Sequence, residues 1–404
     1  MSKKSKPKAK VYFPGLHGLR FFAAMMVVFS HVELIKDYHG YPNLYSSNLA
    51  IYESGRMGVT LFFVLSGFLI SYLLLTERKV TGSISVKKFY GRRILRIWPL
   101  YYLLVFLTFV VLPRITFFAV PKYSAVMPEN FWSTLLLYVF LLPQVALSIF
   151  EPVPFAEPLW SIGVEEQFYL IWPVLMKYVR RFLRLSIAII LVALALKYIA
   201  FWLAEANRAG ENLKYWNYLL NYLYFTRIEC MAVGGLGAWL VFARRQRILD
   251  FIFHRVFQVA LYAVTVFFLV SGTFKPVYNY LAYAACFALI IVNVAANPRS
   301  LIRIENKLFV FLGNISFSIY MFHEIVIKSV MEGLVRTRGV AFNDATSNLA
   351  LYAISIVLTL AVSTIAYYGF ERRFLRLKSS IAVVESGQDL IERGAPLVPT
   401  KSTA

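Results

Sequence analysis

The stretch Gly15-Leu16-His17-Gly18-Leu19-Arg20-Phe21-Phe22-Ala23-Ala24-Met25-Met26-Val27-Val28-Phe29-Ser30-His31 has the composition of a membrane-spanning helix but carries ionisable side chains. Arg20 and His31 are eleven residues apart, which is about three helical turns, so they share one face about 16 Å apart along the axis. Ionisable groups in apolar spans are costly and generally face a protein interior or a cavity. A snorkelling arginine and a structural histidine are the alternative, but two such groups in register favour a functional site.

The composition of the chain is that of a membrane protein. Of its 404 residues 59% are hydrophobic, and 42 are basic against 21 acidic. Apolar runs of the length that crosses a bilayer, about 17–25 residues, recur along the sequence, which predicts an all-α polytopic membrane protein. The basic residues cluster between these runs in the positive-inside pattern, so the net charge of +21 does not indicate a nucleic-acid partner. Cys230 and Cys286 both lie in apolar stretches and support neither a disulfide framework nor a metal cluster.

The positions of the apolar runs predict about ten transmembrane helices. They lie at roughly 16–36, 58–76, 94–112, 160–178, 185–204, 222–242, 250–271, 277–296, 308–330 and 348–370. Placing the basic clusters on the inner side gives an even number of crossings and puts both termini in the cytoplasm. We therefore expect a multi-pass protein of the inner, or cell, membrane.

One further apolar segment, residues 131–149, does not fit as another crossing. A crossing there would move the basic cluster at 177–184 to the outer side, so we expect a re-entrant or interfacial helix. The chain then divides into a basic cytoplasmic segment at 1–15, a membrane domain at 16–376, and a polar cytoplasmic tail at 377–404 that we expect to be disordered.

Arg93 and Arg96 lie one turn apart at the inner end of the third span. Positive-inside anchoring explains them as well as a functional role does, from spacing alone. The functional alternative is a phosphate site, because a guanidinium group forms bidentate hydrogen bonds to phosphate that lysine cannot form.

Two adjacent carboxylates, Glu165 and Glu166, stand near the start of the span at 160–178. Neighbouring residues on a helix point about 100° apart, so only one of the two can face a given cavity. That carboxylate is a candidate base or electrostatic partner, and the sequence leaves open which of the two it is.

Two more spans carry polar groups. His323 lies in the span at 308–330, after the sequence Ser316-Phe317-Ser318-Ile319-Tyr320-Met321-Phe322. Arg227-Ile228-Glu229 precedes Gly234-Gly235-Leu236-Gly237. We interpret this last region as structural, with an Arg/Glu pair that neutralises itself and glycines that allow close helix packing.

The predicted topology sorts these residues into two groups. Arg20, Arg93 and Arg96 lie toward the cytoplasm, and His31, Glu165 and His323 lie in the outer half. An anionic donor entering from the cytoplasm can place its phosphates on the arginines and extend its reactive end outward.

At these residues the chain resembles the acyltransferase 3 family of integral-membrane acyltransferases, over about residues 16–376. Six motifs in order carry the resemblance: Arg20/His31, Gly58 to Ile70, Arg93/Arg96, Trp160 to Tyr169, Arg227-Ile228-Glu229, and Ser316 to His323. Many members have Asp where this chain has His17.

The resemblance implies a ten-helix unit that takes an acyl group, generally acetyl, from cytoplasmic acyl-CoA. The acceptor is a hydroxyl of a surface glycan, a lipid-linked sugar or a secondary metabolite, and membrane lipid surrounds the protein. Some relatives carry an extracytoplasmic hydrolase-like domain, so the transfer is completed either in the membrane domain or by a separate extracytoplasmic partner. We expect no metal ion.

Under this hypothesis Arg93 and Arg96 hold the CoA phosphates and Arg20 contacts the donor further along its path. His31 is the general base for the acceptor hydroxyl, or it carries the acyl group itself. Glu165 orients the imidazole of His31 and stabilises its charged form.

His323 is expected to take part in catalysis, either as a group that supports the catalytic residues or as a group on the acceptor side of the site. Two other classes of function remain open from the sequence. One is a transporter or flippase for a glycan or lipid intermediate, and the other is a structural partner in a glycan-synthesis complex.

Overall fold

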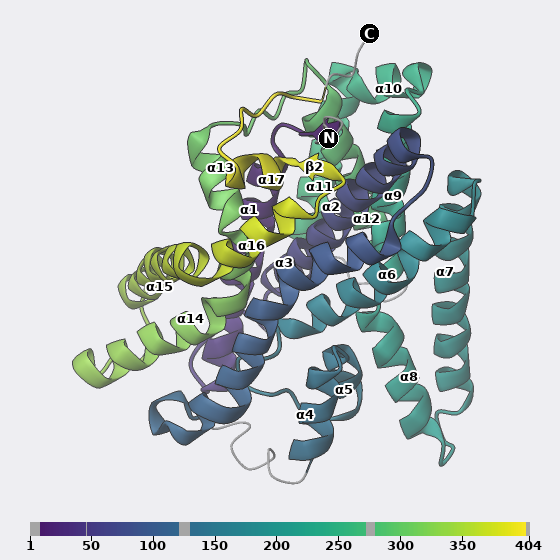
Figure 1. The fold of residues 1–404 in the computed structure, drawn as a ribbon. Coiled ribbons are helices and arrows are strands. Elements are labelled where there is room, and N and C mark those ends of the chain that lie inside the picture. Colours follow the sequence, from purple (N-terminus) through teal and green to yellow (C-terminus); the bar gives the residue numbers. More distant parts are fainter. Residues whose placement is uncertain (1–8, 46, 121–129, 272–278, 401–404) are drawn as a thin grey trace.

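The computed structural model describes residues 9–45, 47–120, 130–271 and 279–400, and almost all of its regular structure is helical (Figure 1). The long helices of the bundle follow one another along the chain. They are α1 (Leu16–Tyr38), α2 (Leu49–Thr81), α3 (Val86–Phe106), α6 (Leu159–Tyr178), α7 (Phe182–Ala206), α8 (Leu213–Phe225), α9 (Ile228–Phe242), α11 (Arg255–Ser271), α12 (Asn279–Ala296), α14 (Ser316–Arg338) and α15 (Ala345–Ala366). The shorter elements are β1 (Ala9–Val11), α4 (Phe131–Val139), α5 (Pro143–Ile149), α10 (Gln246–Phe253), α13 (Lys307–Asn314), α16 (Arg372–Ser380), β2 (Val384–Ser386) and α17 (Gly387–Glu392).

The prediction of an all-α polytopic membrane protein is confirmed. Within the described residues, seven helices are long and apolar enough to cross a membrane, and nine if each of two bent pairs forms one span. These pairs are α10 with α11, bent by 66°, and α13 with α14, bent by 61°. Each of the ten expected spans coincides with a helix or a helix pair, but α6, which carries Glu165 and Glu166, is not among the nine. Ten crossings therefore stays a prediction.

The segment expected to be re-entrant or interfacial forms two short helices, α4 and α5. A helix of nine residues is about 14 Å long, so neither helix can cross a bilayer alone. Figure 1 shows α4 at the end of the molecule opposite α17, at the bottom of the view. Because α17 follows a basic cluster, this placement agrees with an outer position for α4.

The closest helix contact in the bundle is between α2 and α9, and glycines make it possible. A Cβ atom on Gly67 would lie 1.9 Å from the backbone oxygen of Met231, and one on Gly234 would lie 2.1 Å from that of Val64. The interpretation of the glycines near residue 235 as packing residues is thus confirmed.

The expected ion pair between Arg227 and Glu229 does not form. Glu229 pairs with Lys197 of α7, and both side chains are buried. Arg227 lies over the ring of Tyr280, 3.5 Å from its centroid. Residues two apart on a helix point about 200° apart, so Arg227 and Glu229 face different neighbours.

The C-terminal segment, which we expected to be disordered, is folded in the part that the structure describes. Strand β2 pairs in parallel with β1 near the N-terminus, with Ala9 opposite Val384 and Val11 opposite Ser386. Helix α17 begins with a capping box in which Ser386 and Asp389 exchange hydrogen bonds. The prediction was wrong because the C-terminal segment is ordered by a partner strand and helices from distant parts of the chain. The polar composition of the segment gives no information on these contacts.

We expect Gly67→Ala to lower the thermal midpoint of the protein in detergent. The added Cβ overlaps the backbone of α9, and overpacking of this kind costs about 1–3 kcal/mol or more. Gly333→Ala is the matched control, because a Cβ atom there meets nothing within 4 Å. Equal midpoints for the two variants would contradict the packing role of Gly67.

Candidate active site

His31 on α1 and His323 on α14 lie side by side, although they are almost 300 residues apart in sequence. Nε2 of His323 is 3.0 Å from Nδ1 of His31, and Oε1 of Glu324 is 2.8 Å from the same Nδ1. His323 is fully buried, whereas 17% of the His31 side chain is exposed. The structure therefore forms a His31–His323–Glu324 cluster in which His31 is the accessible member.

The hydrogen bonds of this cluster determine which ring nitrogens carry protons. Nδ1 of His323 is 2.8 Å from the carbonyl oxygen of Tyr320, which can only accept, so this nitrogen carries a proton. In a neutral ring Nε2 of His323 is then an acceptor, as is the Glu324 carboxylate. Nδ1 of His31 therefore carries a proton and donates it to Nε2 of His323, while the Glu324 carboxylate lies beside the same nitrogen. This leaves Nε2 of His31 with its lone pair free.

Arg20, Arg93 and Arg96 meet at the junction of two cavities that all three line. We call the first the tail-side cavity; it is also lined by His17, Lys378 and residues 386–388. We call the second the bundle cavity; it is also lined by Ser66, Ser161, Glu165, Ser316 and Tyr320. The prediction that Arg93 and Arg96 project together is confirmed, and Arg20 joins them.

None of these three guanidinium groups forms an ion pair with a carboxylate in the described part of the chain. Nε of Arg93 is buried without a hydrogen-bond partner among the described residues, and its guanidinium lies 5.4 Å from the centroid of the Tyr169 ring. Nδ1 of His17, another buried group of the tail-side cavity, is also without a hydrogen-bond partner there. Buried polar groups without partners are costly, so this arrangement suits a polar or anionic ligand.

Glu165 lies with the arginines and not with His31. Its carboxylate accepts hydrogen bonds of 2.8 Å from Ser66 of α2 and from Tyr169. Glu165 is six residues into α6, about 9 Å beyond the start of the helix, which moves it away from the outer end. The carboxylate that contacts His31 is Glu324, so the expected contact between Glu165 and His31 does not form.

The two neighbouring glutamates face different surroundings, as their 100° separation predicts. Glu166 accepts a hydrogen bond of 3.2 Å from the indole of Trp98, while Glu165 lines the bundle cavity. Of the two, Glu165 is thus the one that faces the arginines.

Tyr320 connects the bundle cavity with the histidines. Its side chain lines the cavity, and its hydroxyl is 2.8 Å from that of Ser161 and donates to the carbonyl of Pro158. Its backbone carbonyl accepts the proton of His323. The bundle cavity thus extends from the arginines to within one helical turn of His323.

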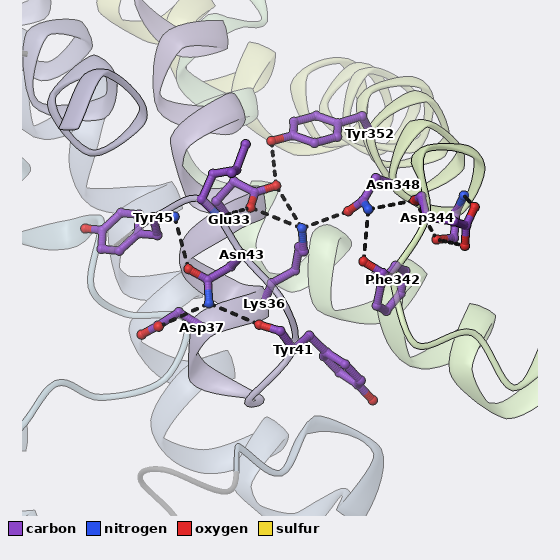
Figure 2. Close-up of polar contacts among 12 residues, drawn as sticks. Glu33, Lys36, Asp37, Tyr41, Asn43, Tyr45, Phe342, Asp344, Asn348 and Tyr352 are labelled. Atoms are coloured by element: carbon purple, nitrogen blue, oxygen red, sulfur yellow. Dashed lines mark hydrogen bonds and ion pairs between the residues drawn. The ribbon is translucent and has the colours of Figure 1, made fainter. Parts of the chain in front are cut away.

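A buried polar network beyond His31 fixes the end of α1 (Figure 2). Glu33 and Lys36 are 1% and 3% exposed and form an ion pair of 3.1 Å. Lys36 also donates to Asn348 at 2.7 Å, and Tyr352 donates to Glu33 at 2.9 Å, so the network joins α1 to α15 (Figure 2). These contacts restrict rotation of α1 and so hold the position of His31.

Glu157, in the turn before α6, adds a second carboxylate on this side. It accepts a hydrogen bond of 2.6 Å from the hydroxyl of Tyr38. Burial raises the pKa of Glu157 and the charge of Glu324 raises it further, while His31 opposes the rise. Glu157 therefore holds its proton to a higher pH than a carboxylic acid in water does.

Sequence reasoning gave no role to Glu324, Glu157 or the Glu33–Lys36 pair. Of these residues, Glu324 has the clearest signal in the sequence, because this ionisable residue directly follows His323 inside an apolar run. The contact of Glu157 with Tyr38 has no local signal, since it depends on how a loop folds.

Comparison with known proteins identifies the family. A model of the acyltransferase domain matches residues 13–368. The chain belongs to the acyltransferase 3 family. The chain is 28% identical over 383 residues to O-acetyltransferase OatA of Staphylococcus aureus, a match that covers 88% of this chain and 56% of OatA. The chain is also 26% identical over 397 residues to a second protein of that species, the putative O-acetyltransferase SACOL0978. This match covers 92% of the present chain and 58% of SACOL0978.

The acyltransferase 3 chain thus spans somewhat more than half the length of these relatives. No solved structure matches it.

The cluster in this acyltransferase 3 chain also has the donor set of a metal site. The ligating atoms of His31, His323 and Glu324 lie within 4.8 Å of one another. Ligands around a tetrahedral zinc ion at about 2.0–2.1 Å would be separated by about 3.3 Å. The 2.8 and 3.0 Å separations in the cluster are shorter and suit direct hydrogen bonds.

We therefore expect the purified protein to contain no stoichiometric transition metal, as measured by elemental mass spectrometry. The comparison is with a His323→Ala variant purified in the same way. About one metal ion per wild-type chain, lost in His323→Ala, would show that the cluster is a metal centre.

Proposed function

We propose that this protein is a membrane O-acyltransferase. It moves an acyl group, acetyl in the first instance, from cytoplasmic acyl-CoA to a hydroxyl of a surface glycan or lipid-linked sugar. The observation that carries the proposal is the set of three partly buried guanidinium groups without carboxylate partners in the described chain. They line a cavity that extends to within one turn of the His31–His323–Glu324 cluster. The names of the O-acetyltransferase relatives support the same class of reaction.

The donor end of this site requires cations in a fixed position. Arg93 and Arg96 bind the phosphates of the donor, because planar guanidinium groups make paired, charge-assisted hydrogen bonds to phosphate oxygens. Arg20 binds the donor where the two cavities meet. Glu165 accepts hydrogen bonds from Ser66 and Tyr169 in the wall of the bundle cavity, so it lines the cavity with the arginines and does not contact the histidine.

His31 is the general base in this mechanism. Its free Nε2 takes the proton of the acceptor hydroxyl as the hydroxyl oxygen bonds to the carbonyl carbon of the thioester. Glu324 and His323, at Nδ1, orient the ring and stabilise the imidazolium. The carbon–sulfur bond then breaks, and the proton on His31 passes to the CoA thiolate. The free Nε2 also fits the other role considered for His31, in which it carries the acyl group between donor and acceptor.

The membrane topology and the extracytoplasmic partner in this proposal are supported by the sequence and by the family. The basic ends of the helices support a cytoplasmic position for both termini in the inner membrane. The acyl transfer is completed in the membrane domain or with a separate extracytoplasmic partner.

We expect His31→Ala to abolish transfer of labelled acetyl from acetyl-CoA to membrane glycans or lipids, while the protein remains in the membrane. Loss of a general base lowers the rate by about 10²–10⁴-fold. His254→Ala is the control, because His254 is exposed and lies at the end of α10, outside the cluster.

Normal acylation in His31→Ala would refute the mechanism. Movement of a glycan intermediate across the membrane without acyl-CoA would favour the flippase alternative instead. Label retained on the wild-type protein in the absence of acceptor would assign His31 the carrier role.

We expect Arg96→Ala to raise the KM for acetyl-CoA at least tenfold, with kcat less affected. A hydrogen bond to a charged group contributes about 1.5–3 kcal/mol, which corresponds to that change. Arg373→Ala is the control, since Arg373 is an exposed cation that lines neither cavity. The same KM in both variants would exclude Arg96 from the donor site.

A further inference from the structure

The C-terminal segment forms part of the wall of the tail-side cavity. Lys378 of α16 and residues 386–388 line this cavity together with Arg20, Arg93 and Arg96. All of these C-terminal residues lie beyond residue 368, where the match to the acyltransferase domain ends. The wall is therefore a feature of this chain that the family model does not include.

Interactions at both ends hold the segment against the cavity. At one end, β2 pairs with β1, which directly precedes Tyr12 and His17. At the other, Thr400 exchanges two hydrogen bonds with Tyr12, of 2.6 and 2.7 Å. Between them, Arg393 donates to Glu385 at 2.7 Å. The segment is thus attached to the N-terminal residues that lead into α1.

Lys378 is a buried cation at this cavity. It is 3% exposed, and its Nζ is 3.1 Å from Oδ1 of Asp389. Burial acts to raise the pKa of Asp389, but Lys378 and the hydrogen bonds from Ser386 lower it overall. Asp389 therefore stays ionised at neutral pH and keeps Lys378 in place.

The two cavities differ in the charge that they present beyond the shared arginines. The tail-side cavity adds the cation Lys378, whereas the bundle cavity adds the carboxylate Glu165 and the hydroxyls of Ser161 and Tyr320. A phosphate monoester carries about −1.5 to −2 charges near pH 7, so it is favoured on the tail side and disfavoured beside Glu165. The uncharged arm of a CoA thioester suits the bundle cavity, which extends toward the histidines.

We infer that Lys378 and residues 386–388 form the site for the nucleotide end of the acyl-CoA donor, with Lys378 as a fourth cation for its phosphates. This inference rests on the proposed function. It assigns a donor-binding role to the C-terminal segment and sets the direction of the donor, with the nucleotide on the tail side of the arginines and the pantetheine arm on the bundle side.

The test compares two donors, acetyl-CoA and acetyl-pantetheine, which lacks the nucleotide and its phosphates. In the full-length protein we expect Lys378→Met to raise the KM for acetyl-CoA about tenfold, with kcat unchanged, because one charge-assisted contact is lost. The KM for acetyl-pantetheine should not change. Lys378→Arg keeps the charge and should keep the KM for acetyl-CoA near that of wild type.

Arg376→Met is the matched control, because Arg376 is an exposed cation on the same helix as Lys378 and lines neither cavity. The inference is overturned if Lys378→Met leaves the KM for acetyl-CoA unchanged or raises the KM of both donors equally. It is also overturned if Arg376→Met reproduces the donor-selective effect. If the wild-type protein transfers acetyl from neither donor, the proposed function itself fails.

A measurement on the wild-type protein keeps the inference testable if Lys378→Met does not fold. Adenosine 3′,5′-bisphosphate carries the phosphates of the nucleotide end without the arm. We expect it to protect the bonds after Lys378 and Arg393 from trypsin. Cleavage at the same rate with and without this nucleotide would overturn the inference.

Discussion

The gathering of three half-buried guanidinium groups at one point is the constraint on which the rest of the structure depends. Burying a charge without a partner costs several kcal/mol, and Arg20, Arg93 and Arg96 have no carboxylate partner in the described chain. The cost is reduced by aromatic faces such as Tyr169 and by the two polar cavities on either side. Helices α1 and α3 must be held rigidly to keep these charges together, and the glycine-mediated packing of α2 on α9 provides a compact support beside them.

The proposed base lies on the same helix as one of these charges but several turns away. His31 shares α1 with Arg20, and its partners His323 and Glu324 come from α14. The Glu33–Lys36 network joins α1 to α15 just beyond His31, so that both sides of the cluster are anchored. Separate binding and reaction sites along one helix suit a donor whose charged end stays in place while its reactive end extends through the protein. A channel or carrier needs no such separation.

Much of the fold could be predicted because it depends on local composition. The length of the apolar runs predicted the helices. The helical period placed Arg93 beside Arg96 and separated Glu165 from Glu166, and the structure agrees. The prediction of a disordered tail was wrong for the described residues up to 400. Polar composition cannot indicate that β2 pairs with β1 from the other end of the chain.

The sequence by itself determined that this protein is a helical membrane protein, and which of its buried residues are ionisable. The reason is that hydrophobicity, helical period and residue type are properties of neighbouring positions. Only the tertiary structure decided which of these residues meet. It placed Glu324 and not Glu165 beside His31, placed Lys197 and not Arg227 beside Glu229, and brought Lys378 to the arginines. Those pairings depend on how the packed helices are rotated and tilted against each other. Many weak contacts along the whole chain together determine this rotation and tilt.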